Sequence, residues 1–459
     1  MLNIYEKLYE KRYLNKVLHT TLNPDEPGVV RIHLVPSKFS FFKVRPSTVI
    51  LNGKDIVPLN PSWTIVLSLF IEEVNNFKGQ EISDEMLNTI IQKVIKKVKK
   101  IYFWVSGGEV RRDLLNMINL FVAIARKEET NIDIGQVSIG DFAKFMKAPH
   151  RMDLMISSMV KEKHWNCNQK CLHCYAAEQE YAETKELSTE EWKKVIDICR
   201  DNCIPQLTFT GGEPTLRKDL VELVKYADWF ITRLNTNGVL LTEKLCKELY
   251  EASLDSVQVT LYSHDAEIHN KLVGANNFDK TVEGIKNAVK AGLNVSINTP
   301  LCSLNKEYVE TLRFAKSLGV IYASSSGLIV TGNAKKSESK ATQLTEKQIT
   351  SILKKACKFA DKEEMELSFT SPGWINEDTL RELKLDIPAC GACLSNMAVA
   401  PDGNVVPCQS WLGKDASLGN ILNVKWNKIW NMSKCKKIRK DSSKISYICP
   451  LRGGKANEK

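Results

Sequence analysis

Three cysteines within eight residues are the strongest chemical signal in this 459-residue sequence. Cys167, Cys171 and Cys174 have the spacing Cys-x3-Cys-x2-Cys, so one loop presents three thiols to a single metal centre. A structural zinc site needs a fourth ligand, which His164 or His173 would supply. An iron–sulfur cluster with one iron left open is the alternative.

A second group of cysteines lies near the C-terminal end. Asp402-Gly403 is typical of a tight turn, and it predicts a hairpin between Met397–Ala400 and Val405–Val406. The hairpin would return the third cysteine of the group toward the first two. A structural zinc ribbon and an iron–sulfur site both fit this pattern. The thiols of the group are Cys390, Cys393, Cys408, Cys435 and Cys449.

The chain has 13 cysteines, an odd number, and its first residues contain no apolar signal region. We therefore expect a cytoplasmic protein that uses cysteines as metal ligands and buried thiols rather than as disulfides. The longest apolar stretch, near Trp63 to Ile71, is far shorter than the roughly 18 residues of a membrane span. The cysteines expected to be buried free thiols are Cys199, Cys203, Cys246, Cys302 and Cys357.

Alternating strands and helices between residues 152 and about 370 must position the first cysteine group. Capping boxes, Ser188 with Glu191 and Thr345 with Gln348, mark two of the helices. Strand–helix units in series predict a parallel α/β sheet, open or closed into a barrel, with chemistry at the C-terminal strand ends. The expected strands are Met152–Met159, Gln206–Thr210, Phe230–Asn235, Ser256–Tyr262, Asn294–Thr299 and Ile321–Val330, and Glu366–Thr370 extends the sheet.

Polar or glycine-rich motifs follow several of these strands. Two adjacent glycines after the second strand let the backbone approach a ligand closely. The candidate ligand-binding residues at the strand ends are Gly211, Gly212, Glu213, Pro214, Asn235, Thr236, Asn237, Ser263, Asn298 and Ile329.

Together, the cysteine spacing and these motifs resemble the radical SAM superfamily over roughly residues 150 to 335. The resemblance implies a partial (β/α)6 TIM-like barrel. It also implies a [4Fe–4S] cluster on Cys167, Cys171 and Cys174, with S-adenosylmethionine (SAM) on the fourth iron. The reduced cluster of such enzymes cleaves SAM to methionine and a 5′-deoxyadenosyl radical, which abstracts hydrogen from a substrate. Glu213 and its backbone would receive the methionyl ammonium. Val273 stands where relatives often carry arginine, so Lys271 is considered for the SAM carboxylate.

The second cysteine group resembles the SPASM/twitch extension of these enzymes, which implies an auxiliary [4Fe–4S] cluster. Its five thiols would fill one cluster but not two. We predict Cys390, Cys393, Cys408 and one C-terminal cysteine as ligands. Cys449 is preferred over Cys435, which sits in a lysine-rich helix.

The segment from Thr48 to Lys97 resembles the PqqD-like peptide-recognition element, a winged-helix-like α+β module that binds a leader peptide along a sheet edge. The resemblance implies a maturase of a ribosomally synthesised precursor peptide (a RiPP enzyme, for example of the sactipeptide type). It would form a thioether or carbon–carbon crosslink or epimerise a residue, using an external one-electron donor such as flavodoxin or ferredoxin. The alternatives are a small-molecule or tetrapyrrole-modifying enzyme of the heme-biosynthesis type and a protein maturase. A non-enzymatic RNA-binding adaptor is disfavoured by the SAM motifs.

We expect four segments: a peptide-recognition module (1–105), a helical connector (106–150), the radical SAM core (151–370) and the auxiliary-cluster domain (371–459). The net charge is +10, and residues 424–459 contribute +9 of it through nine lysines and two arginines against Asp441 and Glu458. The rest is nearly neutral, so neither nucleic acid nor a membrane is an expected partner. The basic segment would offset a thiolate cluster or meet an acidic partner.

Overall fold

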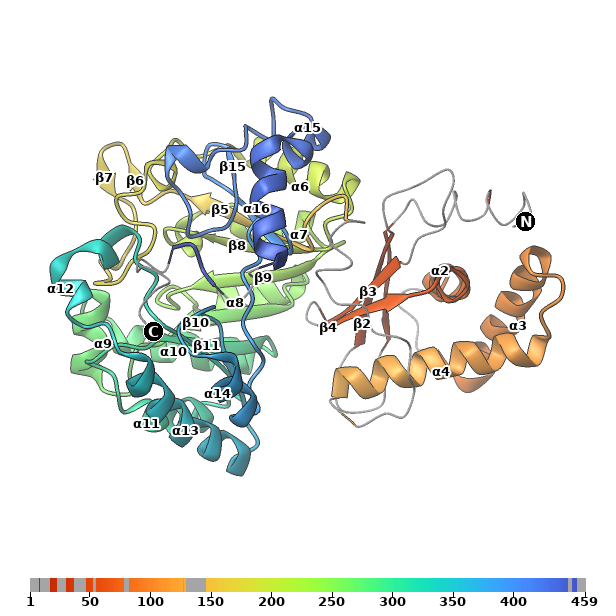
Figure 1. Ribbon diagram of the computed structural model, residues 1–459, viewed down its shortest axis with the longest axis horizontal. Helices are drawn as coiled ribbons and strands as arrows, with labels where there is room; N and C mark the ends of the chain where they lie inside the picture. The colour runs from red at the N-terminus through yellow and green to blue at the C-terminus, as the bar shows by residue number, and fades with distance from the viewer. Residues whose placement is uncertain are drawn as a thin grey trace. The chain divides into compact units, whose positions relative to one another are not determined.

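The computed structural model describes residues 8, 17–22, 30–36, 47–52, 55–77, 82–126, 128, 146–444 and 448–451. The chain divides into two compact units, Met1–Ala148 and Pro149–Lys459 (Figure 1). Each unit has its own hydrophobic core, and each is described separately below.

The first unit combines an antiparallel sheet with three helices. Asn60 caps the first helix by accepting a hydrogen bond from the Trp63 amide, and Ser83 caps the second by accepting one from the Met86 amide. The pair Asn52-Gly53 in the sequence is typical of a tight turn, and the hairpin that it predicts is present, although Gly53 lies outside the described residues. The elements are β1 Leu18–Leu22, β2 Val30–Val35, β3 Ser47–Leu51, β4 Asp55–Leu59, α2 Pro61–Asn75, α3 Asp84–Ile101 and α4 Gly107–Arg126; the strands pair in this order.

Helix α4 belongs to the core of this unit. Val110, Leu114, Met117 and Phe121 recur at helical spacing, are fully buried, and pack in one cluster with α2 and α3. The sequence predicts a helical connector over residues 106–150, whereas α4 packs into the core of the first unit. The difference arises because the apolar stripe of α4 needs a partner face, and α2 and α3 supply one.

A nine-stranded sheet forms the centre of the second unit, in the order β13-β12-β11-β10-β9-β8-β5-β14-β15. All adjacent pairs are parallel except β14 with β15, and the predicted parallel α/β fold is confirmed. Residue Asn396 pairs with Arg151, so the C-terminal hairpin extends the barrel sheet at β5. The strands are β5 Arg151–Ser157, β8 Gln206–Gly211, β9 Ile231–Thr236, β10 Ser256–Thr260, β11 Asn294–Pro300, β12 Tyr322–Ser326, β13 Glu366–Phe369, β14 Asn396–Val399 and β15 Val405–Val406.

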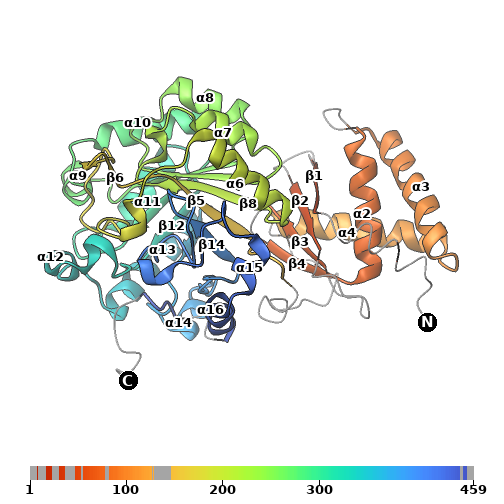
Figure 2. The same ribbon diagram turned by 90° about the horizontal axis from the view of Figure 1, so that it is seen from above.

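The connecting helices lie outside the sheet, and the strand interiors are buried (Figure 2). Both predicted capping boxes are present, at the starts of α6 and α13. A short hairpin, β6 Val160–Lys161 with β7 His164–Trp165, follows β5. The helices are α6 Thr189–Asp201, α7 Leu220–Tyr226, α8 Glu243–Glu251, α9 Ala266–Val273, α10 Phe278–Lys290, α11 Tyr308–Ser317, α12 Ser337–Lys340, α13 Glu346–Lys362, α14 Glu377–Glu382, α15 Trp426–Asn431 and α16 Ser433–Lys444.

Among the described helices, none combines the length and the apolar composition that crossing a bilayer requires.

Candidate functional site

The loop carrying Cys167, Cys171 and Cys174 follows β5 and the β6–β7 hairpin and is braced by later segments. On one side, Lys170 and Leu172 donate backbone hydrogen bonds of 2.9 and 2.8 Å to the last residues of helix α9. On the other, Asn333 donates through its amide to the Cys174 carbonyl (2.9 Å) and through Nδ2 to the Cys171 carbonyl (3.1 Å). The loop conformation is therefore fixed by segments more than 100 residues away.

Two glycines make these braces possible. Gly274 has a φ of +64°, and a Cβ there would lie 2.5 Å from the Lys170 carbonyl oxygen. Gly332 has a φ of +55°, and a Cβ there would lie 2.4 Å from the Cys174 carbonyl oxygen. Any side chain at either position would push the cysteine loop away. The sequence does not predict that Asn333, Gly274 and Gly332 brace the cysteine loop, because these contacts join segments that are distant in the chain.

The three thiols lie close enough to affect one another electrostatically. Burial raises the pKa of the Cys167 thiol to about 12, and the Glu213 carboxylate and the Cys174 thiol add to the rise. Burial also raises the pKa of Cys171, with Cys174 and Cys167 as the next causes. A site that disfavours thiolates this strongly needs positive charge from a bound metal to deprotonate them.

The Gly211-Gly212 turn lies against the end of β5. Gly211 has a φ of +143°, and a Cβ there would lie 2.3 Å from the Ser157 carbonyl oxygen. That same oxygen accepts a 2.9 Å hydrogen bond from the Gly212 amide. The two glycines therefore let the turn pack closely against the backbone at the end of β5, and the turn presents only backbone groups.

Glu213 connects the ends of two strands. Its Oε1 accepts from the Thr215 amide (3.0 Å), the Thr215 hydroxyl (2.5 Å) and the Thr236 hydroxyl (2.6 Å). Its Oε2 accepts from the Asn237 amide at 2.9 Å. Each carboxylate oxygen has about two acceptor positions, and Oε2 has a single donor here, so one position remains on Oε2 for an ammonium group. Burial raises the pKa of Glu213, while the hydrogen bonds from Asn237, Thr215 and Thr236 oppose that rise.

Asn237 carries this network to the cysteine loop, because its Nδ2 donates to Asn168 Oδ1 at 2.5 Å. The buried Asn235 Oδ1 and Asn168 Nδ2 have no protein partner, so each can meet a bound group. The chemistry of three thiols, a glycine turn and unpaired buried amides fits a cluster with SAM. Asn168 was missed because nothing in Cys-x3-Cys identifies the residue after the first cysteine.

The other predicted residues make contacts within their own turns or with the neighbouring strand. Pro214 starts a short 3-10 turn after Glu213. Ser263 is buried, and its hydroxyl accepts from the Asp265 amide at the start of α9 (3.1 Å). Asn298 accepts from the Ser324 hydroxyl of the neighbouring strand (3.0 Å), and Ile329 is half-buried.

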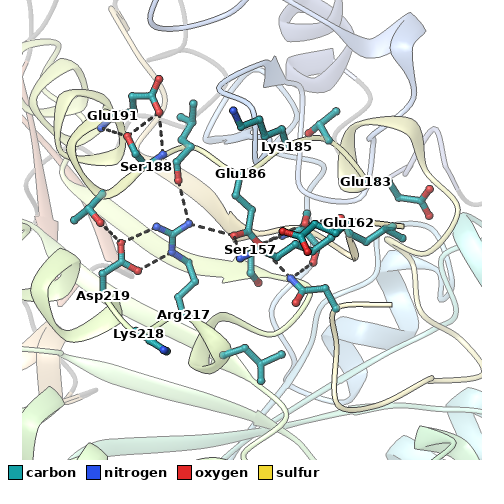
Figure 3. A pocket seen from close by; sticks show the side chains of 18 of the residues that line it. Ser157, Glu162, Glu183, Lys185, Glu186, Ser188, Glu191, Arg217, Lys218 and Asp219 are labelled. Carbon is teal, nitrogen blue, oxygen red and sulfur yellow. Dashed lines mark hydrogen bonds and ion pairs between the residues drawn. The ribbon is translucent and has the colours of Figure 1, made fainter. Parts of the chain in front are cut away.

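A polar pocket of about 1070 Å³ lies beside the glycine turn, between the end of β5, residues 183–191 and residues 216–219 (Figure 3). Arg217 dominates it, with Nε and Nη2 on Asp219 (2.9 and 2.6 Å) and Nη1 on the carbonyls of Ile156 and Leu187 (2.9 and 3.1 Å). The described residues that line the pocket include no cysteine and not Glu213. We therefore assign the pocket a supporting role.

The second cysteine group lies beside the β14–β15 hairpin. The structure confirms the hairpin that Asp402-Gly403 predicts. Burial raises the pKa of Cys408 to about 12, and the nearby Cys390 and Cys449 thiols add to the rise. The Cys393 thiol hydrogen-bonds to the sulfur of Cys435, which lowers the pKa of Cys435 and raises that of Cys393. All five thiols therefore meet in one region.

Cys435 is fully buried on the inner face of α16, although the helix is rich in lysine. Its sulfur accepts a hydrogen bond from Arg439 Nη1 at 3.5 Å. The lysine content argued against Cys435 in the sequence, but helical periodicity separates the two faces. The structure thus brings both Cys435 and Cys449 to the group, and the choice between them as cluster ligand stays a prediction.

Among the residues that the structure describes, no three His, Cys, Asp or Glu side chains converge on the position of a single ion. A four-iron cluster does not require such convergence, because each thiolate binds a different iron. Of the remaining cysteines, Cys199, Cys246, Cys302 and Cys357 are buried as predicted, and Cys203 is half-buried.

Comparison with known proteins agrees with this geometry. Residues 166–315 match the family model of the radical SAM superfamily, and residues 390–450 match SPASM, an iron–sulfur cluster-binding domain. The first match covers the cysteine loop, the glycine turn and β9 to β11. The second covers the five C-terminal cysteines.

The curated relatives are described as enzymes with different activities. The chain is 33% identical over 189 residues (39% of this chain, 46% of the relative) to Fe-coproporphyrin III synthase of Methanosarcina barkeri. It is 35% identical over 159 residues (34% and 52%) to a probable GTP 3′,8-cyclase of Thermococcus kodakarensis. It is 27% identical over 286 residues (58% and 72%) to AdoMet-dependent heme synthase of Oleidesulfovibrio alaskensis. The chain spans about half the length of the first two relatives.

Two solved structures share the fold. Streptococcus suis SuiB bound to its precursor peptide SuiA aligns with a TM-score of 0.58 and 15% identity, over 86% of this chain and 87% of that one. Native anSMEcpe with bound AdoMet aligns with a TM-score of 0.51 and 21% identity, over 64% and 84%. Radical SAM domains bind a [4Fe–4S] cluster and SAM, and SPASM domains bind auxiliary iron–sulfur clusters. Residues 166–315 of this chain are therefore a radical SAM domain, and residues 390–450 are a SPASM domain.

Proposed function

We propose that the protein is a radical SAM maturase that modifies a ribosomally synthesised precursor peptide. When bound, the reduced cluster supplies the electron that cleaves SAM to methionine and a 5′-deoxyadenosyl radical, which abstracts a hydrogen atom from the peptide. The product is a thioether or carbon–carbon crosslink or an epimerised residue. Everything else in the reaction depends on how the chain binds and orients the reactants.

Cys167, Cys171 and Cys174 would hold the SAM-binding cluster. The Gly211-Gly212 backbone and the remaining acceptor position on Glu213 would receive the methionyl ammonium. The unpaired amide of Asn235 would contact the methionine or ribose part of SAM. Ser263, Asn298 and Ile329 would line the nucleoside side, because Ser263 and Ile329 follow β10 and β12 and Asn298 lies near the end of β11, all at the same end of the sheet.

Cys390, Cys393, Cys408 and either Cys435 or Cys449 would hold one auxiliary cluster. Their hairpin pairs with β5, the strand that leads into the first cysteine loop. Tyr175 supports a short separation between the two sites, because the Cys174 and Cys408 thiols, after burial, both raise its pKa. An auxiliary cluster at this position can bind a peptide thiolate or accept an electron.

The first unit is the observation that carries the peptide assignment. Its hairpin β3–β4 followed by helices α2 and α3 supports the small α+β module that the PqqD-like resemblance implies. The fold likeness to SuiB covers 86% of the chain, which is more than the 311 residues of the second unit alone. A leader peptide would add to an edge strand, β1 or β4, by backbone hydrogen bonding.

A second candidate is a tetrapyrrole-modifying enzyme. It is supported by the sequence similarity to AdoMet-dependent heme synthase and Fe-coproporphyrin III synthase. A protein maturase is the third.

Reconstituted protein should contain about eight iron ions per chain if both clusters form, and about four if only one does. With dithionite and SAM, it should release 5′-deoxyadenosine. The decisive experiment co-expresses the protein with a short peptide encoded beside its gene and measures the peptide mass. Loss of two hydrogens per crosslink, or incorporation of deuterium from solvent for epimerisation, supports the peptide assignment.

The Cys167→Ala, Cys171→Ala, Cys174→Ala variant is the matched control and should leave the peptide mass unchanged. An unmodified peptide with the intact enzyme, together with turnover of a coproporphyrin substrate, would favour the heme-type alternative.

A further inference from the structure

Helix α16 has two chemically different faces. Its inner face carries Cys435, Arg439 and Ser442, which recur at helical spacing. Cys435 and Ser442 are buried, and Arg439 is half-buried. Lys436, Lys437 and Lys440 are exposed, and at 3.6 residues per turn they fall within about 100° of one another. The lysines therefore form one stripe on the side away from the cysteines.

The inner face touches the auxiliary cysteines directly. The Ser442 hydroxyl donates to the Ala392 carbonyl at 2.9 Å and lies 3.8 Å from the Cys390 sulfur. Cys435 contacts Cys393, as described above. A helix with its side chains is about 10 Å across, so the lysine stripe lies roughly that distance from the thiols.

The cation that faces the thiols is Arg439. Its guanidinium carbon lies 3.8 Å from the Trp430 ring centroid, and its Nη2 donates to the Trp430 carbonyl at 3.0 Å. These contacts fix Arg439 where it offsets negative charge on sulfur. Lys436, Lys437 and Lys440 point the other way and do not perform that role.

Charge on this surface is one-sided. Between Lys425 and Ser443 there are seven basic residues and one acidic residue, Asp441. Lys434 is engaged, because its Nζ donates to the carbonyls of Asp415 and Ser417. Lys428 is exposed on the neighbouring helix α15, which packs against α16, and Lys425 is exposed at the N-cap of α15 (Figure 1). A concentrated positive field beside a redox site attracts an acidic protein and orients it.

We propose that the lysine stripe of α16 is the docking surface for a small acidic one-electron carrier protein. The inference rests on the proposed function, since it requires a cluster on the auxiliary cysteines. In each docking event the reduced carrier gives up one electron and is oxidised, and the cluster takes up that electron and is reduced. No bond forms or breaks and no proton moves. The reverse transfer uses the same surface.

The experiment uses the full-length protein with Cys167, Cys171 and Cys174 replaced by alanine, so that the auxiliary cluster alone reports. An acidic bacterial ferredoxin, chemically reduced, is mixed with it anaerobically, and the bleaching of the cluster is followed by stopped flow. At low salt, Lys436→Glu, Lys437→Glu, Lys440→Glu should lower the second-order rate constant by about tenfold or more. The deficit should shrink as the salt concentration rises.

The matched control reverses three exposed lysines on α13, Lys347, Lys354 and Lys355, and should react like the parent protein. Equal rates in the parent and the α16 variant, or an equal loss in the α13 control, would overturn the proposal. If the charge-reversal variant loses iron, the Lys→Gln version at the same three positions replaces it and should slow the reaction by a smaller factor.

The result is separable from the proposed function. Dithionite is a small reductant that needs no docking surface, so dithionite-driven SAM cleavage by protein with all its cysteines tests the enzyme assignment alone. Absence of that cleavage, with both clusters loaded, would reject the proposed function and leave the ferredoxin rates as the test of the surface.

Discussion

At the scale of single residues, Glu213 links the glycine turn to the end of β9 through four hydrogen bonds. Glu213→Gln would place an NH2 group opposite backbone and hydroxyl donors and leave at least one of them unpaired. We expect a loss of about 1–3 kcal/mol in the free energy of unfolding and weaker SAM binding. Urea titration and calorimetric SAM titration measure the two effects, and Glu267→Gln, an exposed carboxylate, should change neither.

Gly332 offers a sharper test of the cysteine loop. Gly332→Ala adds a Cβ against the Cys174 carbonyl, so the loop must move and the iron content of the reconstituted protein should fall. Gly292→Ala is the control, because Gly292 also has a positive φ (+82°) but a Cβ there meets only the Tyr250 ring at 3.4 Å. If both variants bind iron like the wild type, the brace does not control cluster assembly.

His269 makes the stability of the second unit depend on pH. Burial lowers its pKa to about 4, whereas an unfolded histidine titrates near 6.5. Between these values the unfolded state binds more protons, so stability falls as the pH drops from 7 toward 4, by up to about 3 kcal/mol. His269→Gln should remove this part of the slope in urea unfolding between pH 7.5 and 5.5. The exposed His164→Gln variant should keep the wild-type slope.

The candidate cofactor-binding residues were easier to predict from the sequence than the residues that position them. Cys167, Cys171, Cys174 and Glu213 were identifiable because thiols and a Gly-Gly-Glu turn have distinctive spacing. Asn168 and Asn333 were not, because an asparagine acts here only through partners that the fold brings close. The burial of Cys435 was also not predictable from the lysine content of its helix, because the lysines lie on the opposite face.

At the scale of elements, Arg217 joins three segments around the polar pocket: the end of β5, the loop before α6 and the residues before α7 (Figure 3). Its side chain is 10% exposed. Arg217→Met would leave the Asp219 carboxylate and two carbonyls without their cation, at a cost of about 3 kcal/mol in unfolding free energy. The loss of unfolding free energy for Arg217→Lys should lie between zero and the loss for Arg217→Met, because a lysine keeps the charge but cannot make the paired guanidinium hydrogen bonds.

Urea unfolding measures both variants, and Lys218→Met is the exposed neighbour that serves as control. A loss below about 1 kcal/mol for Arg217→Met would show that the network is no stronger than a surface ion pair.

The strands lie close to their predicted positions, but some of them end at different residues. The predicted sixth strand ran to Val330, whereas β12 ends at Ser326. The reason is Gly327, whose amide donates to the Ser371 hydroxyl (3.0 Å) and whose missing side chain makes room for the Trp374 ring. The pairing of β14 with β5 was also not predicted, because a hairpin pattern does not identify a distant edge partner.

At the scale of the whole molecule, the division into two units predicts separable activities. Residues 149–459 contain the complete parallel sheet and both cysteine groups, and their core clusters include no residue of the first unit. This fragment should fold, bind iron and cleave SAM with dithionite at a rate within about twofold of the full chain, because catalysis depends on groups held by the barrel itself. It should lose affinity for the leader peptide and therefore fail to modify the full precursor. Fluorescence anisotropy with labelled leader peptide and mass spectrometry of the precursor measure these losses. A fragment that modifies the precursor as efficiently as the full chain would assign peptide recognition to the barrel and leave the first unit without that role.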